Sequence, residues 1–433
     1  MNMMVFWILA AILCLGSLWL GIKGQGEDSS VEEFFACKSN LKLAALMLTI
    51  LATQLGGGSV IGSAEAAYTH GWMAIFYSLG IALGLIIMAF TVGPALRKFG
   101  AMTIAEVMGN LYKSKRIHLI ASFLSIVTLF LILVAIGVSC RKVFISLGFD
   151  SPWFLISFWA VLIGYTTFGG LRAVVITDKL QIIFILAVFA LVIGYLGNHF
   201  IPVLQSPAFF PTSDQALPLS SWVLMPLCFM LISQDMGQRC FAAESDRSIR
   251  LAMIGGGVFL VLATCIPVFV GMLGKYLGLA TCNGSIFMTV IYANLPPVII
   301  SFVAIAVLMA IISTADSLLC AISSNVTLDF LKSSSMTESR LVTFIIGILS
   351  LILSFYEGDV IPVMLMGYSL SVFGLLVPFL MGLYVKNVTK KQALQSLSIG
   401  VIGFIGISFF PFLGAELGVL GLATLPYISS IFK

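Results

Sequence analysis

The sequence predicts an all-α membrane protein with about thirteen transmembrane helices. Of its 433 residues, 60% are hydrophobic and only 9% are charged, whereas a soluble domain carries about a quarter charged residues. Apolar runs of roughly 20 residues recur along the chain, and each is long enough to cross a hydrocarbon core of about 30 Å. We therefore expect a multi-pass protein whose partners include the lipid bilayer and exclude nucleic acid.

The apolar runs place the expected helices along the whole chain. The first run resembles a secretory signal in length, but it lacks a basic segment before it, and Lys23 follows it, so we interpret it as a retained helix. The predicted spans are 3–22, 41–68, 72–96, 117–147, 152–168, 178–197, 219–240, 249–274, 297–330, 341–356, 359–385, 392–410 and 412–431.

The distribution of Lys and Arg predicts the orientation of these spans. With the amino terminus outside, the basic residues fall in alternate connections, such as the stretch from Arg97 to Arg116, while residues 198–218 contain none. About 19 of the 22 basic residues then lie on the inside, as the positive-inside rule requires. The carboxyl terminus is expected in the cytoplasm.

Ten of the spans form two halves of five. An odd number of helices in each half means that the two repeats run through the membrane in opposite directions, which is typical of transporters that expose one site to each side in turn. The predicted divisions are an extra helix and cytoplasmic loop (1–40), a first repeat (41–197), an outer loop (198–218), a second repeat (219–385) and two peripheral helices (386–433).

The first helix of each half, which is the first and sixth of the ten, is predicted to be broken. In the stretch TQLGGGSVIG three consecutive glycines, Gly56 to Gly58, interrupt an apolar run, and each glycine costs about 1 kcal/mol in a helix relative to alanine. In the second half the break is expected near Met225 and Pro226. Glycine and proline are common in membrane helices, but paired breaks at corresponding positions favour a binding site at the bilayer midplane.

Adjacent hydroxyls in a later apolar span suggest what this site binds. Ser313 and Thr314 lie deep in that span, where such side chains often bond the carbonyl one turn back. Carbonyls freed between Ala52 and Leu55, together with that of Ala310, would complete a neutral cage of five oxygens. The carboxyl end of a half-helix also favours a cation.

Two carboxylates in or near the membrane are further candidates. Asp316 is close to the proposed cage along the chain, and Asp178 begins a predicted span at the cytoplasmic side, where it would line the ion's exit. A salt bridge or a helix cap explains Asp178 equally well. Glu65 receives no role.

Four stretches resemble the sodium:solute symporter family, which includes sodium-coupled proline, pantothenate and sugar carriers. They are RKFGAMTIAEVMGNLY, FGGLRAVVITDKLQ, QDMGQRCFAAESDRSIR and ISTADSLL, and the resemblance extends from Leu41 to Lys391. It implies a LeuT-type inverted repeat. It also implies a sodium ion held at positions that match Ala52, Leu55, Ala310, Ser313 and Thr314.

The resemblance further implies a second ion region and a solute pocket. Some relatives hold a second sodium near positions that match Asp178 and Ser317, and Asp316 lies beside them. The family's solute pocket adjoins the first break. The residues expected to contact solute are Gln54, Gly56, Gly57, Ser59, Trp222 and Tyr368.

Arg141 has two interpretations. On a straight helix it lies about 36 Å from the inner end, which places it at the outer interface. If it turns inward, it anchors a solute carboxylate through a bidentate pair. Relatives that carry sugars place amide and acidic side chains where this chain has glycine and serine, so a small amino acid or carboxylate is favoured over a sugar.

The resulting hypothesis is a secondary active transporter that couples sodium entry to solute uptake, in a bacterial plasma membrane. A proton-coupled carrier of the same fold is the alternative, with Asp316 as its carboxylate. A membrane sensor derived from a carrier is less favoured because no signalling domain follows Lys433. The sequence contains no catalytic constellation that would predict an enzyme. Sodium is the only ion expected, with no organic cofactor and no obligatory protein partner.

Overall fold

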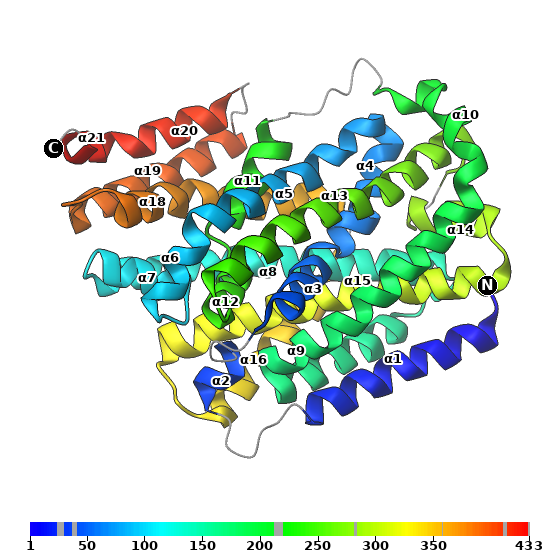
Figure 1. Cartoon of the computed structure of the whole chain (residues 1–433), viewed down its shortest axis with the longest axis horizontal. Coiled ribbons are helices and arrows are strands. Elements are labelled where there is room, and N and C mark those ends of the chain that lie inside the picture. Colours follow the sequence, from blue (N-terminus) through cyan, green and yellow to red (C-terminus); the bar gives the residue numbers. More distant parts are fainter. Residues whose placement is uncertain are drawn as a thin grey trace.

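In the computed structural model the chain forms a bundle of helices, most of which run in nearly the same or opposite directions (Figure 1). The structure describes residues 1–23, 30–36, 41–211, 220–280, 284–356, 358–409 and 414–431. Parts of the predicted cytoplasmic and outer loops, residues 24–29, 37–40 and 212–218, lie outside these ranges. The described residues contain no strand, only an isolated bridge between Leu41 and Ala243, so the all-α class is confirmed.

The helices of the amino-terminal part all lie before residue 212. They are α1 (Met3–Lys23), α2 (Val31–Ala36), α3 (Leu43–Gln54), η1 (Gly58–Gly62), α4 (Ser63–His70), η2 (Gly71–Ala74), α5 (Ile75–Phe90), α6 (Val92–Phe99), α7 (Ile104–Leu111), α8 (Lys115–Ser146), α9 (Pro152–Leu196), η3 (Gly197–His199), α10 (Phe200–Leu204) and η4 (Pro207–Phe209).

Helices of the carboxyl-terminal part begin at Ser220. They are η5 (Ser220–Leu224), α11 (Met225–Met230), α12 (Gln234–Ala242), α13 (Asp246–Tyr276), α14 (Ile286–Asn294), α15 (Pro297–Ser324), η6 (Asn325–Leu331), α16 (Met336–Leu353), α17 (Val360–Ser371), η7 (Val372–Leu376), α18 (Val377–Tyr384), α19 (Lys390–Phe409), α20 (Ala415–Thr424), η8 (Leu425–Tyr427) and α21 (Ile428–Ile431).

Nine helical runs of the described residues are long and apolar enough to cross a membrane, and two shorter apolar runs accompany them. The longest single helix, α9, has 45 residues and would measure about 68 Å if it were straight, more than twice the hydrocarbon thickness. It turns at Gly170, where φ is 55° and ψ is −157°, a conformation almost restricted to glycine. We expected a connection between 168 and 178, whereas the helix is interrupted only at Gly170. The count of thirteen spans stays a prediction.

The buried centre of the bundle is built around α15 and α13. Helix α15 packs against α8, α9, α1 and α16, and α13 packs against α3, α4 and α5. Close approach of backbones is needed here, because a Cβ added at Gly271 of α13 would run into the carbonyl oxygen of Ala64 in α4. Small residues at such contacts allow the van der Waals packing that holds helices together in lipid.

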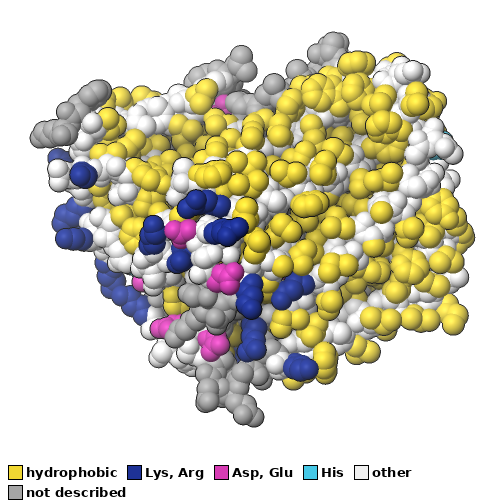
Figure 2. Space-filling model, viewed as in Figure 1, with side chains coloured by type: hydrophobic (Ala, Val, Ile, Leu, Met, Phe, Trp, Pro, Cys, Tyr) yellow, Lys and Arg dark blue, Asp and Glu magenta, His cyan; other side chains and the backbone are white. Residues whose placement is uncertain are grey.

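The two ends of the bundle differ in charge. Hydrophobic side chains cover much of the surface, and Lys and Arg gather toward the left of Figure 2, the end at which α6, α7 and α12 lie in Figure 1. We call this the basic end. The opposite end carries Arg141 and Lys142, which lie near the end of α8, and Lys275, which lies in the last turn of α13.

A short helix, α2, lies within the segment that we expected to be a cytoplasmic loop. Phe34 and Phe35 of α2 are buried, and the helix packs against α9 and α12. The amide of Gln238 in α12 donates to the Phe35 carbonyl at 3.2 Å. The expected loop therefore contains a short helix, because the two aromatic rings have an apolar surface to cover.

Candidate ion and solute site

The glycine run marks a real interruption between α3 and η1. Helix α3 ends at Gln54, Leu55 has φ −87° and ψ 52°, and η1 begins at Gly58. A Cβ added at Gly56 would overlap the hydroxyl of Thr314, and one added at Gly57 would lie 2.8 Å from the Ser139 hydroxyl oxygen. The glycines thus let α15 and α8 approach the interrupted backbone closely.

The second interruption is at residues 231–233, between α11 and α12, and not at Met225 and Pro226 as we expected. Pro226 instead lies in the first turn of α11, directly after the π-helical η5. Proline fits there because the preceding π-helical turn accommodates the missing backbone donor. The prediction of this position was wrong for that reason.

Hydroxyls of α15 meet carbonyls at the end of α3. Ser313 donates to the carbonyl of Ala52 at 2.9 Å and to that of Ala310 at 3.0 Å. Thr314 donates to the carbonyl of Thr53 at 2.7 Å and lies 3.4 Å from that of Ala310. All of these residues are buried. The structure thus brings four of the five predicted cage residues into contact and adds Thr53, which we did not predict.

Leu55, the fifth cage residue, caps α3. Its amide donates to the Leu51 carbonyl at 2.9 Å, and its side chain is fully buried. It therefore ends the same half-helix that presents the Ala52 and Thr53 carbonyls.

A buried arginine, Arg239 of α12, connects this region to Asp178. Nη2 of Arg239 lies 3.5 Å from Oδ2 of Asp178 and donates to the Ser317 hydroxyl at 2.8 Å. It also donates to the hydroxyl of Thr49 at 3.1 Å and to that of Thr53. The Thr49 hydroxyl in turn donates to Asp178. Asp178 lies inside α9 and caps no helix, so of the two readings left open, the geometry is that of a buried ion pair.

Asp316 faces α9 rather than α3. Tyr165 donates to its Oδ2, and the Ser317 hydroxyl lies 3.4 Å from its Oδ1. Ser317 also donates to the Ser313 carbonyl at 3.0 Å. The three predicted residues Asp178, Asp316 and Ser317 are therefore joined to the hydroxyl pair through one polar network.

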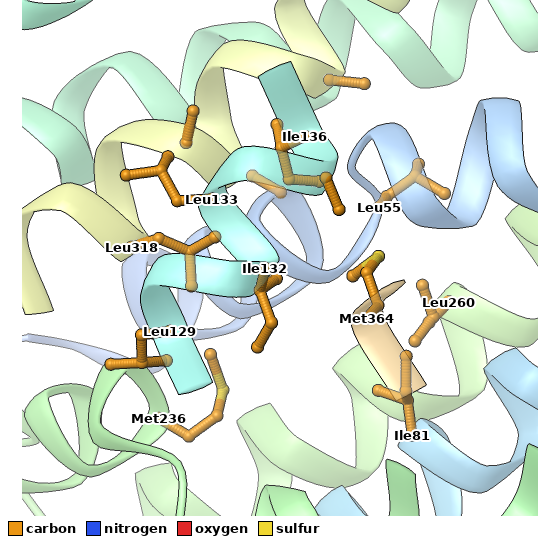
Figure 3. Packing of buried hydrophobic residues seen from close by; sticks show 14 of the residues in the cluster. Leu55, Ile81, Leu129, Ile132, Leu133, Ile136, Met236, Leu260, Leu318 and Met364 are labelled. Carbon is orange, nitrogen blue, oxygen red and sulfur yellow. The ribbon is translucent and has the colours of Figure 1, made fainter. Parts of the chain in front are cut away.

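A central cavity of about 30 Å³ lies beside the first interruption. This volume holds about one water molecule, so the cavity is too small for an organic solute in this conformation. Figure 3 shows Ile132 and Ile136 of α8 on the side of that helix toward Leu55 and Met364. The lining includes four predicted solute residues, Gln54, Gly56, Ser59 and Tyr368, and others that we did not predict, above all Tyr77, Phe229, Asp235 and Met364.

The remaining predicted solute residues lie outside this cavity. Arg141 and Trp222 line a pocket of about 550 Å³ at the end opposite the basic end, and Gly57 packs against Ser139 of α8. Nη1 of Arg141 donates to the Phe355 carbonyl at 2.8 Å. Trp222 and Tyr77 are paired edge to face with centroids 6.4 Å apart, so this aromatic pair lies between the outer pocket and the central cavity.

A sequence signal existed for some of the residues that we missed. Asp235 and Arg239 are one helical turn apart in a largely apolar region, and ionisable residues at membrane depth are functional candidates by default. No local pattern marks Tyr77 or Phe229, because aromatic residues are common in every span of this chain.

A membrane bundle with interrupted helices around a closed central cavity is the architecture of a secondary transporter. The model of the family described as "Sodium:solute symporter family" matches residues 34–400. The chain belongs to this family, whose members are transporters and not enzymes, and it is a sodium-coupled solute transporter.

Curated relatives agree with this assignment. The sodium/pantothenate symporter of Haemophilus influenzae is 25% identical over 422 residues, covering 88% of this chain and 86% of the relative. Sodium/proline symporter 2 of Staphylococcus saprophyticus is 25% identical over 426 residues, covering 89% and 82%.

Solved structures share the fold. A Na+-coupled sialic acid symporter in a substrate-bound outward-open state has a TM-score of 0.83 at 18% identity, covering 99% of this chain and 98% of that one. MhsT in complex with L-phenylalanine has a TM-score of 0.60 at 15% identity, covering 91% and 98%. The LeuT-type fold is therefore confirmed.

Proposed function

We propose that the protein takes up a small amino acid or carboxylate by alternating access, driven by a sodium ion bound at the Ala52, Leu55 and Ala310 carbonyls and the Ser313 and Thr314 hydroxyls. The observation that carries this proposal is the pair of α15 hydroxyls on the carbonyls that end α3. Hard cations prefer oxygen ligands, and the carboxyl end of a half-helix favours positive charge. With no carboxylate among its ligands, the site releases its ion readily in each cycle.

The solute class is supported by the relatives and by the cavity. Proline is an amino acid and pantothenate is a carboxylate, and both name relatives of this chain. Gln54, Gly56, Ser59 and Tyr368 contact the solute in the central cavity. Arg141 and Trp222 act on its entry path through the outer pocket, and Gly57 keeps α8 close to the break.

The polar network predicts how the ion leaves. Arg239 joins the cage region to Asp178 through Ser317, so the exit runs past Ser317 and Asp178 toward the basic end, and Asp316 borders it. A second sodium near Asp178 would compete with the guanidinium of Arg239. We therefore assign Asp178, Asp316 and Ser317 to the exit path.

One sodium ion supplies enough energy for accumulation. Moving one charge inward is worth about 2.3 kcal/mol per 100 mV, and a tenfold sodium gradient adds about 1.4 kcal/mol. This supports roughly 500-fold accumulation of a neutral solute. The basic end faces the cytoplasm of a bacterial cell in this proposal, with the amino terminus outside.

The test is uptake by purified protein in proteoliposomes, with labelled amino acids and carboxylates and an imposed sodium or proton gradient. We expect sodium-driven uptake that the Ser313→Ala/Thr314→Ala double variant loses while it remains folded. Ser323→Ala is the matched control, because Ser323 is buried in the same helix and its hydroxyl donates to the Leu319 carbonyl one turn back. It should leave the sodium dependence unchanged.

Proton coupling is the alternative, favoured by the buried carboxylate of Asp316 beside Tyr165. It predicts uptake that follows the proton gradient, ignores sodium, and is lost in Asp316→Asn. That outcome would contradict the sodium cage.

A further inference from the structure

The lining of the central cavity includes one acidic side chain and no basic one. Among its lining residues Asp235 is acidic, and none is Lys, Arg or His. Asp235 is 3% exposed and lies in the first turn of α12, directly after the second interruption. The cavity therefore presents a carboxyl group to a solute without a basic group beside it.

Within the part of the chain that the structure describes, this carboxylate has no cationic partner. The Ser233 hydroxyl donates to its Oδ1. Arg239, one turn further along α12, contacts only the backbone carbonyl of Asp235, at 2.9 Å, and turns Nη2 toward Asp178. No Lys, Arg or His nitrogen of the described residues lies within 4.0 Å of the Asp235 carboxylate. Charges at membrane depth are normally paired, so a cation from outside the chain is the natural partner of this carboxylate.

Three aromatic rings line the cavity with Asp235. The rings of Phe229 and Tyr368 are stacked with centroids 4.5 Å apart, and those of Tyr77 and Tyr368 are stacked at 6.4 Å. The two tyrosine hydroxyls are 2.9 Å apart. Ring faces attract an ammonium group within about 6 Å of the centroid. A carboxylate beside such rings matches the chemistry of an amine cation.

We infer that the transported solute carries a protonated or quaternary amine, and that Asp235 with Phe229, Tyr77 and Tyr368 recognises it. The inference rests on the proposed function, because it concerns the solute of that transporter. It narrows the solute class to amino acids and other amine cations, and it excludes plain carboxylates. A first-turn acid also stabilises a helix through the macrodipole, but that role does not need a carboxylate in a solute cavity.

The experiment compares solutes that differ only in the amine. The pairs are L-alanine with propionate, L-proline with cyclopentanecarboxylate, and choline with 3,3-dimethylbutan-1-ol. Sodium-driven uptake into proteoliposomes and thermal stabilisation of the purified protein are measured for each. We expect at least one pair in which only the amine member is transported and stabilises the protein. Asp235→Asn should raise its KM and its half-stabilising concentration roughly 30-fold or more, the loss typical of one partner of a buried charge pair.

Three further variants separate this role from other effects of the substitution. Asp246→Asn removes an acid from the first turn of the neighbouring α13, where it pairs with Arg97, so it controls for the helix-dipole role and should leave the KM unchanged. Phe229→Leu keeps Asp235 and removes a ring, and it should weaken the amine member selectively. Asp235→Glu should recover part of the affinity.

Stabilisation by both members of every pair alike would overturn the inference. The inference would also be overturned if Asp235→Asn raised the sodium concentration needed for uptake but left the discrimination between the amine and its amine-free analogue unchanged. The binding readout needs no gradient. Amine-selective stabilisation that Asp235→Asn loses would therefore support the inference even if uptake followed protons and the sodium proposal failed.

Discussion

Gly56 links the break in the first helix to the proposed ion cage, because it is in close contact with Thr314. A Cβ at this position would overlap the Thr314 hydroxyl, so Gly56→Ala must displace that group. Losing one buried hydroxyl contact costs about 1–3 kcal/mol, so we expect the sodium concentration for half-maximal uptake to rise roughly 5- to 150-fold. Gly194→Ala, where the added Cβ meets nothing within 4 Å, is the control, and an unchanged sodium dependence in Gly56→Ala would contradict the cage.

Arg239 is a residue whose loss should affect stability. It is fully buried and paired with Asp178, and removing one partner leaves an uncompensated buried charge at a cost of about 3–5 kcal/mol. We expect Arg239→Ala to lower the thermal unfolding midpoint strongly and the Asp178→Asn/Arg239→Gln double variant to lower it less. Arg250→Ala changes an exposed arginine of the same end and should be neutral. Equal losses in the single and double variants would show that the pair does not matter.

The sequence predicts contacts of this kind only where the residues that make them are close in the chain. Ser313, Thr314 and Ala310 lie within one helical turn, so their proximity follows from helix geometry, and the glycine run identifies the opposite wall. Asp235, Tyr77 and Phe229 come from three different elements and meet only through tertiary packing. For Arg141, helix length offered the outer interface as one of two interpretations, and Arg141 does line the outer pocket. Nothing in the sequence indicated that Trp222 lines that pocket as well.

At the scale of elements, apolar runs located most helices but did not locate their interruptions. Gly170 divides α9 without any polar stretch, because one residue with positive φ is enough to turn the chain. In the second half, a proline suggested a break that lies several residues further on. Helix α2 was missed because six residues are too few to show a helical period.

The turn at Gly170 yields a prediction about α2. Gly170 has a conformation almost restricted to glycine, and an added Cβ would lie 2.5 Å from the Phe34 carbonyl oxygen. Gly170→Ala should therefore both strain α9 and displace α2. We expect it to reduce stability clearly more than Gly148→Ala, which also has positive φ but where the Cβ meets nothing within 4 Å.

Thermal unfolding and limited proteolysis at α2 measure the two effects separately. Faster cleavage at α2 in Gly170→Ala alone is expected. If both variants lost the same stability and α2 stayed protected in each, contact with α2 would not be the cause.

At the scale of the whole molecule, alternating access requires the connection between the outer pocket and the central cavity to close and to open again. Lys142 of α8 lies 3.0 Å from Glu65 of α4 and 3.7 Å from Asp359 at the start of α17, so these ion pairs tie three elements together over the central cavity. Opening toward this end must break at least one of them. An ion pair worth about 1 kcal/mol changes the ratio of open to closed molecules roughly fivefold.

Lys142→Gln should therefore favour the state open toward the outer pocket. With Ser59→Cys as a reporter in the central cavity of a cysteine-free protein, we expect a membrane-impermeant thiol reagent added on that side to label it several-fold faster in the Lys142→Gln variant. Lys275→Gln removes a lysine from the same end without touching Glu65 and should not change the rate, which also controls for net charge. Excess solute should slow labelling in both variants because it fills the cavity.

An unchanged labelling rate in Lys142→Gln would mean that the barrier between the pocket and the cavity is the packing of Trp222 on Tyr77. Trp222→Ala would then be the variant that opens it.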